Sequence, residues 1–179
     1  MHRLLLSAIL FGALAMPATA TAQLRIDLNI PALKLVVWEG DEVLETYPIA
    51  VGMPGFDTPT GEFAITHAEW NPWWRPPERA WAKDDVDTPP GPNNPMGRVK
   101  LFFLPYYFFH GTPEAASIGS PASHGCVRMR NADVIELARM VMENGGERRS
   151  PGWFQRVINR VRNTQDVRLS QPVALRVRA

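Results

Sequence analysis

Cysteine is almost absent from the sequence: its 179 residues include a single one, Cys126. A lone cysteine cannot form a disulfide within its own chain, so a disulfide-stabilised scaffold is excluded. Such a residue is most often a small buried hydrophobic group, but an unpaired thiol in an exported protein is also a candidate reactive group. The residues around Cys126 therefore decide which role applies.

Long apolar runs are absent after the N-terminal segment. The run from Leu4 to Ala15 follows a weakly positive start and is shorter than the ~20 residues that a membrane-spanning helix needs. Small residues at the spacing of a cleavage site follow it, so we predict a signal peptide over residues 1–22, cleaved before Gln23. An uncleaved anchor is the alternative. No cysteine lies near this site, which argues against lipoprotein processing, and we expect an exported chain with no stable membrane span.

The net charge is small, at +1, and no segment interleaves aromatic with basic residues, so we expect no binding to nucleic acid. The charge is uneven, however. Residues 1–127 carry 8 Lys and Arg against 13 Asp and Glu, whereas residues 128–179 carry 11 Arg against 5 acidic residues. A basic face can rest on an anionic polymer or a membrane surface, or it can simply be solvated. Because no internal repeat is present, we expect residues 23–179 to form one domain.

The first half of the exported chain alternates apolar and polar residues with the period of two that is typical of half-buried strands. We predict strands over residues 24–30, 33–38, 43–51 and 61–67, the first three as an antiparallel meander. Glycine and proline in residues 52–61 predict a shaped loop. His67 ends the fourth strand, where we expect it to lie at the surface or to pack on the sheet.

Residues 68–96 are rich in proline and tryptophan, with seven and four of them in 29 residues. A loop of this length without its own secondary structure is usually functional or disordered, and disordered segments are poor in aromatic residues. We therefore predict an ordered flap beside a cleft, with tryptophans partly packed on the domain: Trp70, Trp73, Trp74 and Trp81. Trp74 is our candidate for substrate contact, and packing is its default role.

Two apolar, aromatic stretches after this flap predict buried strands over residues 99–104 and 106–110, so that His110 lies at a strand end. After Met129 the apolar period changes to that of a helix, which Asn131 can cap. Residues 144–146, Asn-Gly-Gly, end that helix.

A short arginine-rich helix over residues 153–161 and one or two closing strands over residues 167–177 complete the expected elements. The pattern as a whole predicts a mainly β fold with one or two short helices.

Cys126 is surrounded by the groups that thiol catalysis needs, because His110 and His124 both lie within sixteen residues of it. A free thiol has a pKa near ~8.5, which we expect a neighbouring base or cation to lower, and histidine is the usual proton acceptor. Residues 124–126 bring three successive N–H groups next to the sulfur, and these form an oxyanion hole if the turn aims them together. Gly125 permits such a turn because glycine tolerates positive φ.

The sequence Ser123-His124-Gly125-Cys126-Val127-Arg128, preceded by His110-Gly111-Thr112, resembles the signature of the L,D-transpeptidase catalytic domain, the YkuD family. Other stretches resemble family members too: Val51-Gly52 with Thr58-Pro59-Thr60-Gly61, the proline-rich residues 71–77 and 90–97, and Ser117-Ile118-Gly119. The resemblance covers about residues 24–142. It implies an L,D-transpeptidase-like β-sandwich in the periplasm.

The resemblance also implies an activity, that of a peptidoglycan transferase of cell wall biogenesis and cell shape. A cysteine nucleophile attacks the carbonyl of the diamino acid in a tetrapeptide stem, D-alanine leaves, and an amine acceptor takes the acyl group. The expected partners are peptidoglycan stem peptides, with an outer-membrane lipoprotein as a further acceptor, and neither metal nor cofactor is implied. An L,D-carboxypeptidase or endopeptidase of the same fold is the alternative. A non-catalytic wall-binding protein is a third class.

Site roles follow residue by residue from the resemblance. Cys126 is the expected nucleophile, His110 the general base oriented by the carbonyl of Gly111, and the N–H groups of residues 124–126 the oxyanion hole. His124 is the alternative base, although its place two residues from Cys126 makes the geometry awkward.

Two further residues have more than one expected role. Arg128 can lower the thiol pKa, hold a substrate carboxylate or form a structural ion pair. Ser123, a second candidate for substrate contact, is expected to support the turn by hydrogen bonding. A zinc site from His110, His124 and Cys126 also remains open.

Overall fold

The computed structural model describes residues 23–159 and 162–179, and the predicted signal peptide lies outside them. The described elements are, in chain order, β1 (Leu24–Asn29), β2 (Lys34–Glu39), β3 (Glu42–Pro48), β4 (Val51–Gly52), β5 (Gly61–Trp70), η1 (Ala80–Ala82), β6 (Val99–Leu104), β7 (Tyr107–Thr112), η2 (Ala115–Ser117), β8 (Pro121–Ser123), β9 (Val127–Arg130), α1 (Asn131–Asn144), α2 (Pro151–Asn159) and β10 (Gln165–Arg178). The predicted mainly β fold is confirmed, and of the one or two helices expected the described residues contain two α-helices. No helix in this part of the chain is long and apolar enough to cross a bilayer.

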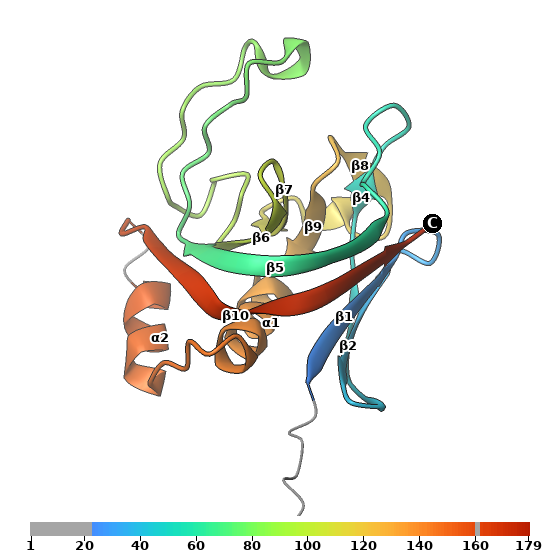
Figure 1. The fold of residues 1–179 in the computed structure, drawn as a ribbon. Coiled ribbons are helices and arrows are strands. Elements are labelled where there is room, and N and C mark those ends of the chain that lie inside the picture. The colour runs from blue at the N-terminus through green and yellow to red at the C-terminus, as the bar shows by residue number, and fades with distance from the viewer. Residues whose placement is uncertain (1–22, 160–161) are drawn as a thin grey trace, which may run out of the picture.

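One curved, eight-stranded sheet contains most of the strands, in the order β3-β2-β1-β10-β5-β6-β7-β9, and β4 and β8 form a separate parallel pair (Figure 1). The predicted antiparallel meander of β1, β2 and β3 is confirmed. Pairing beyond it joins distant parts of the sequence, because β10 lies between β1 and β5, and β7 pairs with β9 in parallel. The last pairing brings the strand of His110 beside the strand that follows Cys126.

Helix α1 lies against one face of this sheet and contacts β5, β6, β7, β9 and β10. Its apolar stripe is buried, as the helical period predicts: Val134, Ala138, Val141 and Met142 lie in the core, and Ile135 is partly buried against it. Gly145 ends the helix, as expected from the Asn-Gly-Gly sequence. Since Phe109 of β7 and Val127 of β9 are also in this core, their neighbours in sequence point to the opposite face.

Three expectations about elements are wrong in detail. The third strand is split, because β3 ends at Pro48 and a separate β4 begins at Val51. Strand β5 continues to Trp70, paired with both β6 and β10, so Trp70 is a core residue and not part of the flap. Asn131 does not cap α1: Arg130 occupies the cap position, and Asn131 is the first helical residue.

The flap comprises residues 71–98, between β5 and β6, and its one helix or strand is the short helix η1. In Figure 1 it rises as the green loop above the sheet, on the side away from α1 and α2. It therefore stands over the face on which the side chains next to Phe109 and Val127 lie.

Candidate active site

His110 and Cys126 lie on adjacent segments of one sheet face. The parallel register pairs Phe109 with Val127 and His110 with Arg128, so Cys126 precedes β9 at the level of Phe108. Because Phe109 and Val127 point into the core, the residues on either side of them face the flap. His110, Cys126 and Arg128 accordingly line a single cleft of about 1510 Å³.

The thiol of Cys126 is protonated at neutral pH. Its sulfur lies 3.5 Å from the carbonyl oxygen of Tyr106, to which the S–H can donate. Burial raises the pKa of Cys126 to about 11, although the N–H of Phe108 and the cations of Lys100 and Arg128 act in the opposite direction. The expected lowering of the thiol pKa is therefore wrong for this state, because desolvation outweighs the nearby positive charge.

His110 is buried, with 3% of its surface exposed, and its Nδ1 lies 2.7 Å from the carbonyl oxygen of Gly111. A carbonyl only accepts, so Nδ1 carries the proton and Nε2 has the free lone pair in the neutral ring. Burial lowers the pKa of His110 to about 4. The cations Arg128 and Lys100 also lower this pKa, whereas the hydrogen bond to the carbonyl of Gly111 acts to raise it. At neutral pH His110 is thus an uncharged base, and the expected contact with Gly111 is present.

The turn before Cys126 depends on Gly125, whose φ is +106°. A Cβ there would lie 2.9 Å from Cε1 of Tyr107, so both the backbone angle and the space favour glycine. Ser123 closes the turn: its hydroxyl donates to the carbonyl of Cys126 at 2.5 Å and accepts from the N–H of Gly125 at 3.1 Å. The expected turn-supporting role of Ser123 is confirmed. With 2% of its surface exposed and its hydroxyl occupied, Ser123 is poorly placed for substrate contact.

The N–H of Gly125 is engaged by Ser123, so the three N–H groups of residues 124–126 are not equivalent. Thr58 holds the same turn from the other side. Its hydroxyl donates to the carbonyl of Gly125 and accepts from the N–H of Gly52, both at 2.9 Å. Thr58 belongs to the Thr-Pro-Thr-Gly stretch that resembles the family, but sequence reasoning gave it no role.

Two of the three roles expected of Arg128 have support, and the third, holding a substrate carboxylate, stays a prediction. It pairs with Glu114 at 3.0 Å, and its charge lowers the pKa of Cys126. Asn131 also belongs to the site's framework. Its side chain accepts from the N–H of Arg98 and donates to the carbonyl of Thr112, so it joins the end of the flap to the end of β7. This tertiary use explains why Asn131 does not cap its own helix.

His124 lies in an aromatic stack that lines the cleft. The indole of Trp81 lies parallel to its ring with centroids 3.9 Å apart, and Phe56 meets it edge-on at 4.6 Å. Trp74, the candidate for substrate contact, lines the cleft and has its ring centroid 6.3 Å from that of Trp81. Burial lowers the pKa of His124 too, but the stack gives its ring a packing role.

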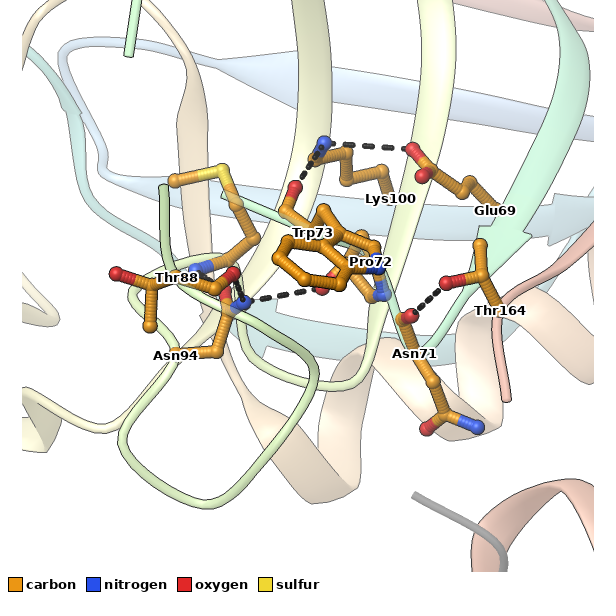
Figure 2. Close-up of polar contacts among 9 residues, drawn as sticks. Glu69, Asn71, Pro72, Trp73, Thr88, Asn94, Lys100 and Thr164 are labelled. Atoms are coloured by element: carbon orange, nitrogen blue, oxygen red, sulfur yellow. Dashed lines mark hydrogen bonds and ion pairs between the residues drawn. The ribbon is translucent and has the colours of Figure 1, made fainter. Parts of the chain in front are cut away.

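The flap is ordered by buried amides (Figure 2). Asn94 donates to the carbonyls of Pro72, Thr88 and Pro89, and accepts from the N–H of Met96. It therefore ties the outgoing arm of the flap to the incoming one, next to a two-way backbone bridge between Trp74 and Thr88. The expected ordered flap is present, with its start moved to Asn71.

The base of the flap is held to the body of the molecule. Asn71 donates to the carbonyls of Val157 and Asn163 and accepts from Arg98, while Thr164 donates to the carbonyl of Asn71. Trp73 links this region to the cleft, since its carbonyl accepts from Lys100 of β6 at 3.1 Å (Figure 2).

The three residues of the zinc alternative do not come together. Within the described residues, no group of three or more His, Cys, Asp and Glu is arranged to hold a metal ion, and His110, His124 and Cys126 form no such group. His67 is stacked on Phe102 with ring centroids 4.1 Å apart, which agrees with the expected sheet-packing role.

Comparison with known proteins agrees with the motif. A model of the L,D-transpeptidase catalytic domain family, YkuD, matches residues 23–162. The YkuD protein of Bacillus licheniformis, provisionally named an L,D-transpeptidase, is 35% identical over 134 residues, which cover 74% of this chain and 68% of that protein. Its counterpart in Bacillus subtilis is 37% identical over 127 residues, or 70% of this chain and 65% of that protein.

Among solved structures, an L,D-transpeptidase from Mycobacterium smegmatis superimposes with a TM-score of 0.55 at 16% identity, over 88% of this chain and 59% of that one. This likeness shows the fold. The chain spans about two thirds of the length of the Bacillus relatives. The family match over most of the chain, together with the motif around the thiol and imidazole, shows that the protein belongs to the YkuD family of L,D-transpeptidase catalytic domains.

Proposed function

We propose that the protein is a peptidoglycan L,D-transpeptidase that acts through an acyl-enzyme on Cys126. One observation carries the proposal: the only thiol of the chain shares a sheet face and a cleft with a buried, uncharged imidazole. Membership of the family supports the reaction class, and the substrate is the tetrapeptide stem of bacterial peptidoglycan.

In the first half-reaction, the sulfur of Cys126 attacks the carbonyl carbon of the diamino acid in the stem. Because the thiol is protonated and His110 is not, the proton moves from Sγ to Nε2 during the attack. The carbonyl of Gly111 then accepts from Nδ1–H and stabilises the imidazolium. The bond to D-alanine breaks, its nitrogen takes the proton from Nε2, and a thioester remains on Cys126.

The tetrahedral intermediate needs donors for its oxyanion. We assign this role to the N–H groups of His124 and Cys126, since the N–H of Gly125 is engaged by Ser123. Ser123 and Thr58 act indirectly, because they hold the turn that presents these donors.

In the second half-reaction, an amine of another stem peptide attacks the thioester. Nε2 takes a proton from that amine, the C–S bond breaks, and the sulfur recovers a proton. Water as acceptor would give L,D-carboxypeptidase activity instead, and a lysine of an outer-membrane lipoprotein would give anchoring. The flap covers the cleft from which the acceptor must arrive, so we assign acceptor choice to it. We propose that the reaction takes place in the periplasm, after export.

The proposal is tested by incubating the purified protein with a peptidoglycan tetrapeptide fragment and an amine acceptor, followed by mass spectrometry of the products. We expect a cross-linked dimer and free D-alanine from the wild type, and neither from Cys126→Ala. Turnover by Cys126→Ala at the wild-type rate would contradict the proposal. Release of tripeptide alone, with acceptor present, would reassign the protein as a carboxypeptidase.

A further inference from the structure

A lysine lies inside the cleft in a position that the proposed reaction does not use. Four residues form one row across the sheet: Glu69 on β5 pairs with Lys100 on β6, Lys100 with His110 on β7, and His110 with Arg128 on β9. Residues paired in this way point to the same face. Lys100 therefore faces the flap from the strand next to the proposed base, and it lines the cleft with Cys126.

The ammonium of Lys100 is largely removed from solvent, since only 12% of its side chain is exposed. It donates to a carboxylate oxygen of Glu69 at 3.3 Å and to the carbonyl of Trp73 at 3.1 Å (Figure 2). It also lies 5.3 Å from the ring centroid of Phe108, the residue level with Cys126. A lysine is rarely buried without a reason, because desolvation of its charge is costly.

Two of the three N–H bonds of this ammonium are accounted for by Glu69 and Trp73. Burial lowers the pKa of Lys100, but Glu69 and Cys126 both act to keep it charged. The interaction with Cys126 is reciprocal, since Lys100 in turn lowers the pKa of the thiol. Arg128 is the other cation with this effect, and it is paired with Glu114.

We propose that Lys100 is a positioning residue for the nucleophile: held by Glu69 and by the flap carbonyl of Trp73, its buried charge stabilises the thiolate of Cys126. This inference rests on the proposed role of Cys126. It assigns the lysine an electrostatic effect on the sulfur and no proton transfer. It also makes the reactivity of the thiol depend on the flap, because Trp73 supplies one of the two acceptors that hold the ammonium.

Other charged or titratable groups also line the cleft. They are His110 of β7, Arg128 of β9, Glu114 and His124 of the segments between β7 and β9, and Asp57 of the loop before β5. The flap adds Arg75, Glu78, Arg79, Asp84 and Asp85. Substitutions confined to Lys100 leave all of these in place, so a change in thiol ionisation between such variants reports on Lys100.

The test is the rate of alkylation of Cys126 by iodoacetamide as a function of pH, followed by intact mass. The single cysteine makes the adduct unambiguous. We expect Lys100→Gln and Lys100→Met to move the pH profile about one unit upward, which makes alkylation near neutral pH roughly tenfold slower. Lys100→Arg, which keeps the charge, should follow the wild type. Lys83→Gln, which changes an exposed lysine of the flap, is the matched control.

Wild-type profiles for both neutral variants would overturn the inference and leave the proposed function intact, because turnover of the tetrapeptide is measured separately. Loss of folding in both neutral variants, with Lys100→Arg folded, would also overturn it, since the charge would then be structural. A wild-type thiol that resists alkylation at every pH would overturn the inference and the proposed function together.

Discussion

The floor and the flap of the cleft are ordered by different means. The floor is the flap-facing side of β5, β6, β7 and β9, where strand register alone puts Lys100, His110 and Arg128 in one row. The flap has no strand of its own and is held by side-chain amides, chiefly Asn94 and Asn71. A sheet fixes side chains more rigidly than a loop does. The floor is therefore suited to hold reacting groups in place, and the flap is suited to control which molecules enter the cleft.

The largest effect on this comparison should come from removing His110, the proposed base on the floor. His110→Ala should lower kcat/KM for the tetrapeptide by roughly 10²–10⁴-fold, because the thiol then has no proton acceptor. His67→Ala, which changes the histidine stacked on Phe102, is the control and should keep most of the activity. Similar losses in both variants would mean that His110 matters only for packing.

The pH dependence should also reflect the floor. Burial lowers the pKa of His110 to about 4, so the base stays unprotonated down to that pH. We expect kcat/KM to be flat through pH 6.5 and to fall about tenfold per pH unit only below pH 4. An acid limb well above pH 4 would contradict His110 as the base.

The pH dependence of the free energy of unfolding should also depend on His110. The folded pKa of His110 is depressed, so the unfolded chain binds more protons between about pH 6.5 and pH 4. The contribution of His110 to stability is therefore fully present above pH 6.5 and declines as the pH falls toward 4. Melting temperatures of wild type and His110→Asn across this range should converge at low pH.

A smaller effect is expected from the amide that orders the flap. Asn94→Ala leaves the carbonyls of Pro72 and Pro89 and the N–H of Met96 without their partner, while the carbonyl of Thr88 keeps the N–H of Trp74; the change should lower the free energy of unfolding by about 3 kcal/mol. Cleavage by proteases within residues 71–98 should become faster. Asn93→Ala changes the exposed neighbour and serves as control. Equal protease resistance in the two variants would show that Asn94 does not order the flap.

The effects of backbone strain and of crowding can be separated with two glycines near β8, one in the turn between β8 and β9 and one before β8. Gly125→Ala combines a φ of +106° with a Cβ 2.9 Å from Tyr107, whereas Gly119→Ala has a φ of +90° and nothing within 4 Å. Each should lose about 1–2 kcal/mol of stability from strain, with a further loss only at Gly125. Denaturant titration gives both values, and a larger loss at Gly119 would contradict the account.

The smallest effect is expected at the contact between flap and turn. Trp81→Ala removes the ring stacked on His124, a contact worth about 0.5–1.5 kcal/mol. Because it belongs to the flap, we expect a change in KM of up to about tenfold with kcat nearly unchanged. A large fall in kcat would instead mean that Trp81 contributes to the chemical step, as the groups of the floor are proposed to do.

Much of the fold was predictable because alternation and helical periodicity are local signals. They gave the meander of β1 to β3, the apolar stripe of α1 and the end of that helix at Gly145. The parallel pairing of β7 with β9 and the insertion of β10 between β1 and β5 were not predictable in this way, since no local pattern specifies a partner strand. The prediction that Asn131 caps α1 was wrong because its tertiary contacts to Arg98 and Thr112 override the capping preference of asparagine.

The candidate site, like the fold, could be predicted only in part from the sequence. The motif gave Cys126, His110 and Gly125, because spacing and residue type are readable along the chain. It could not give the raised thiol pKa, which depends on burial, or the use of the Gly125 N–H by Ser123. Lys100 did have a signal that sequence reasoning passed over: a single charge within an otherwise apolar strand, Val99–Leu104. Asn94 had a weaker one, its place among prolines.

The central claim is that the floor carries a nucleophile and its base, and its most direct test is the intact mass of the protein after brief exposure to a peptidoglycan tetrapeptide without acceptor. The account predicts an adduct with the mass of the tripeptide acyl group, located on Cys126 by peptide mapping and absent from Cys126→Ala. Product formation with no adduct on Cys126, or the same adduct on another residue, would contradict it.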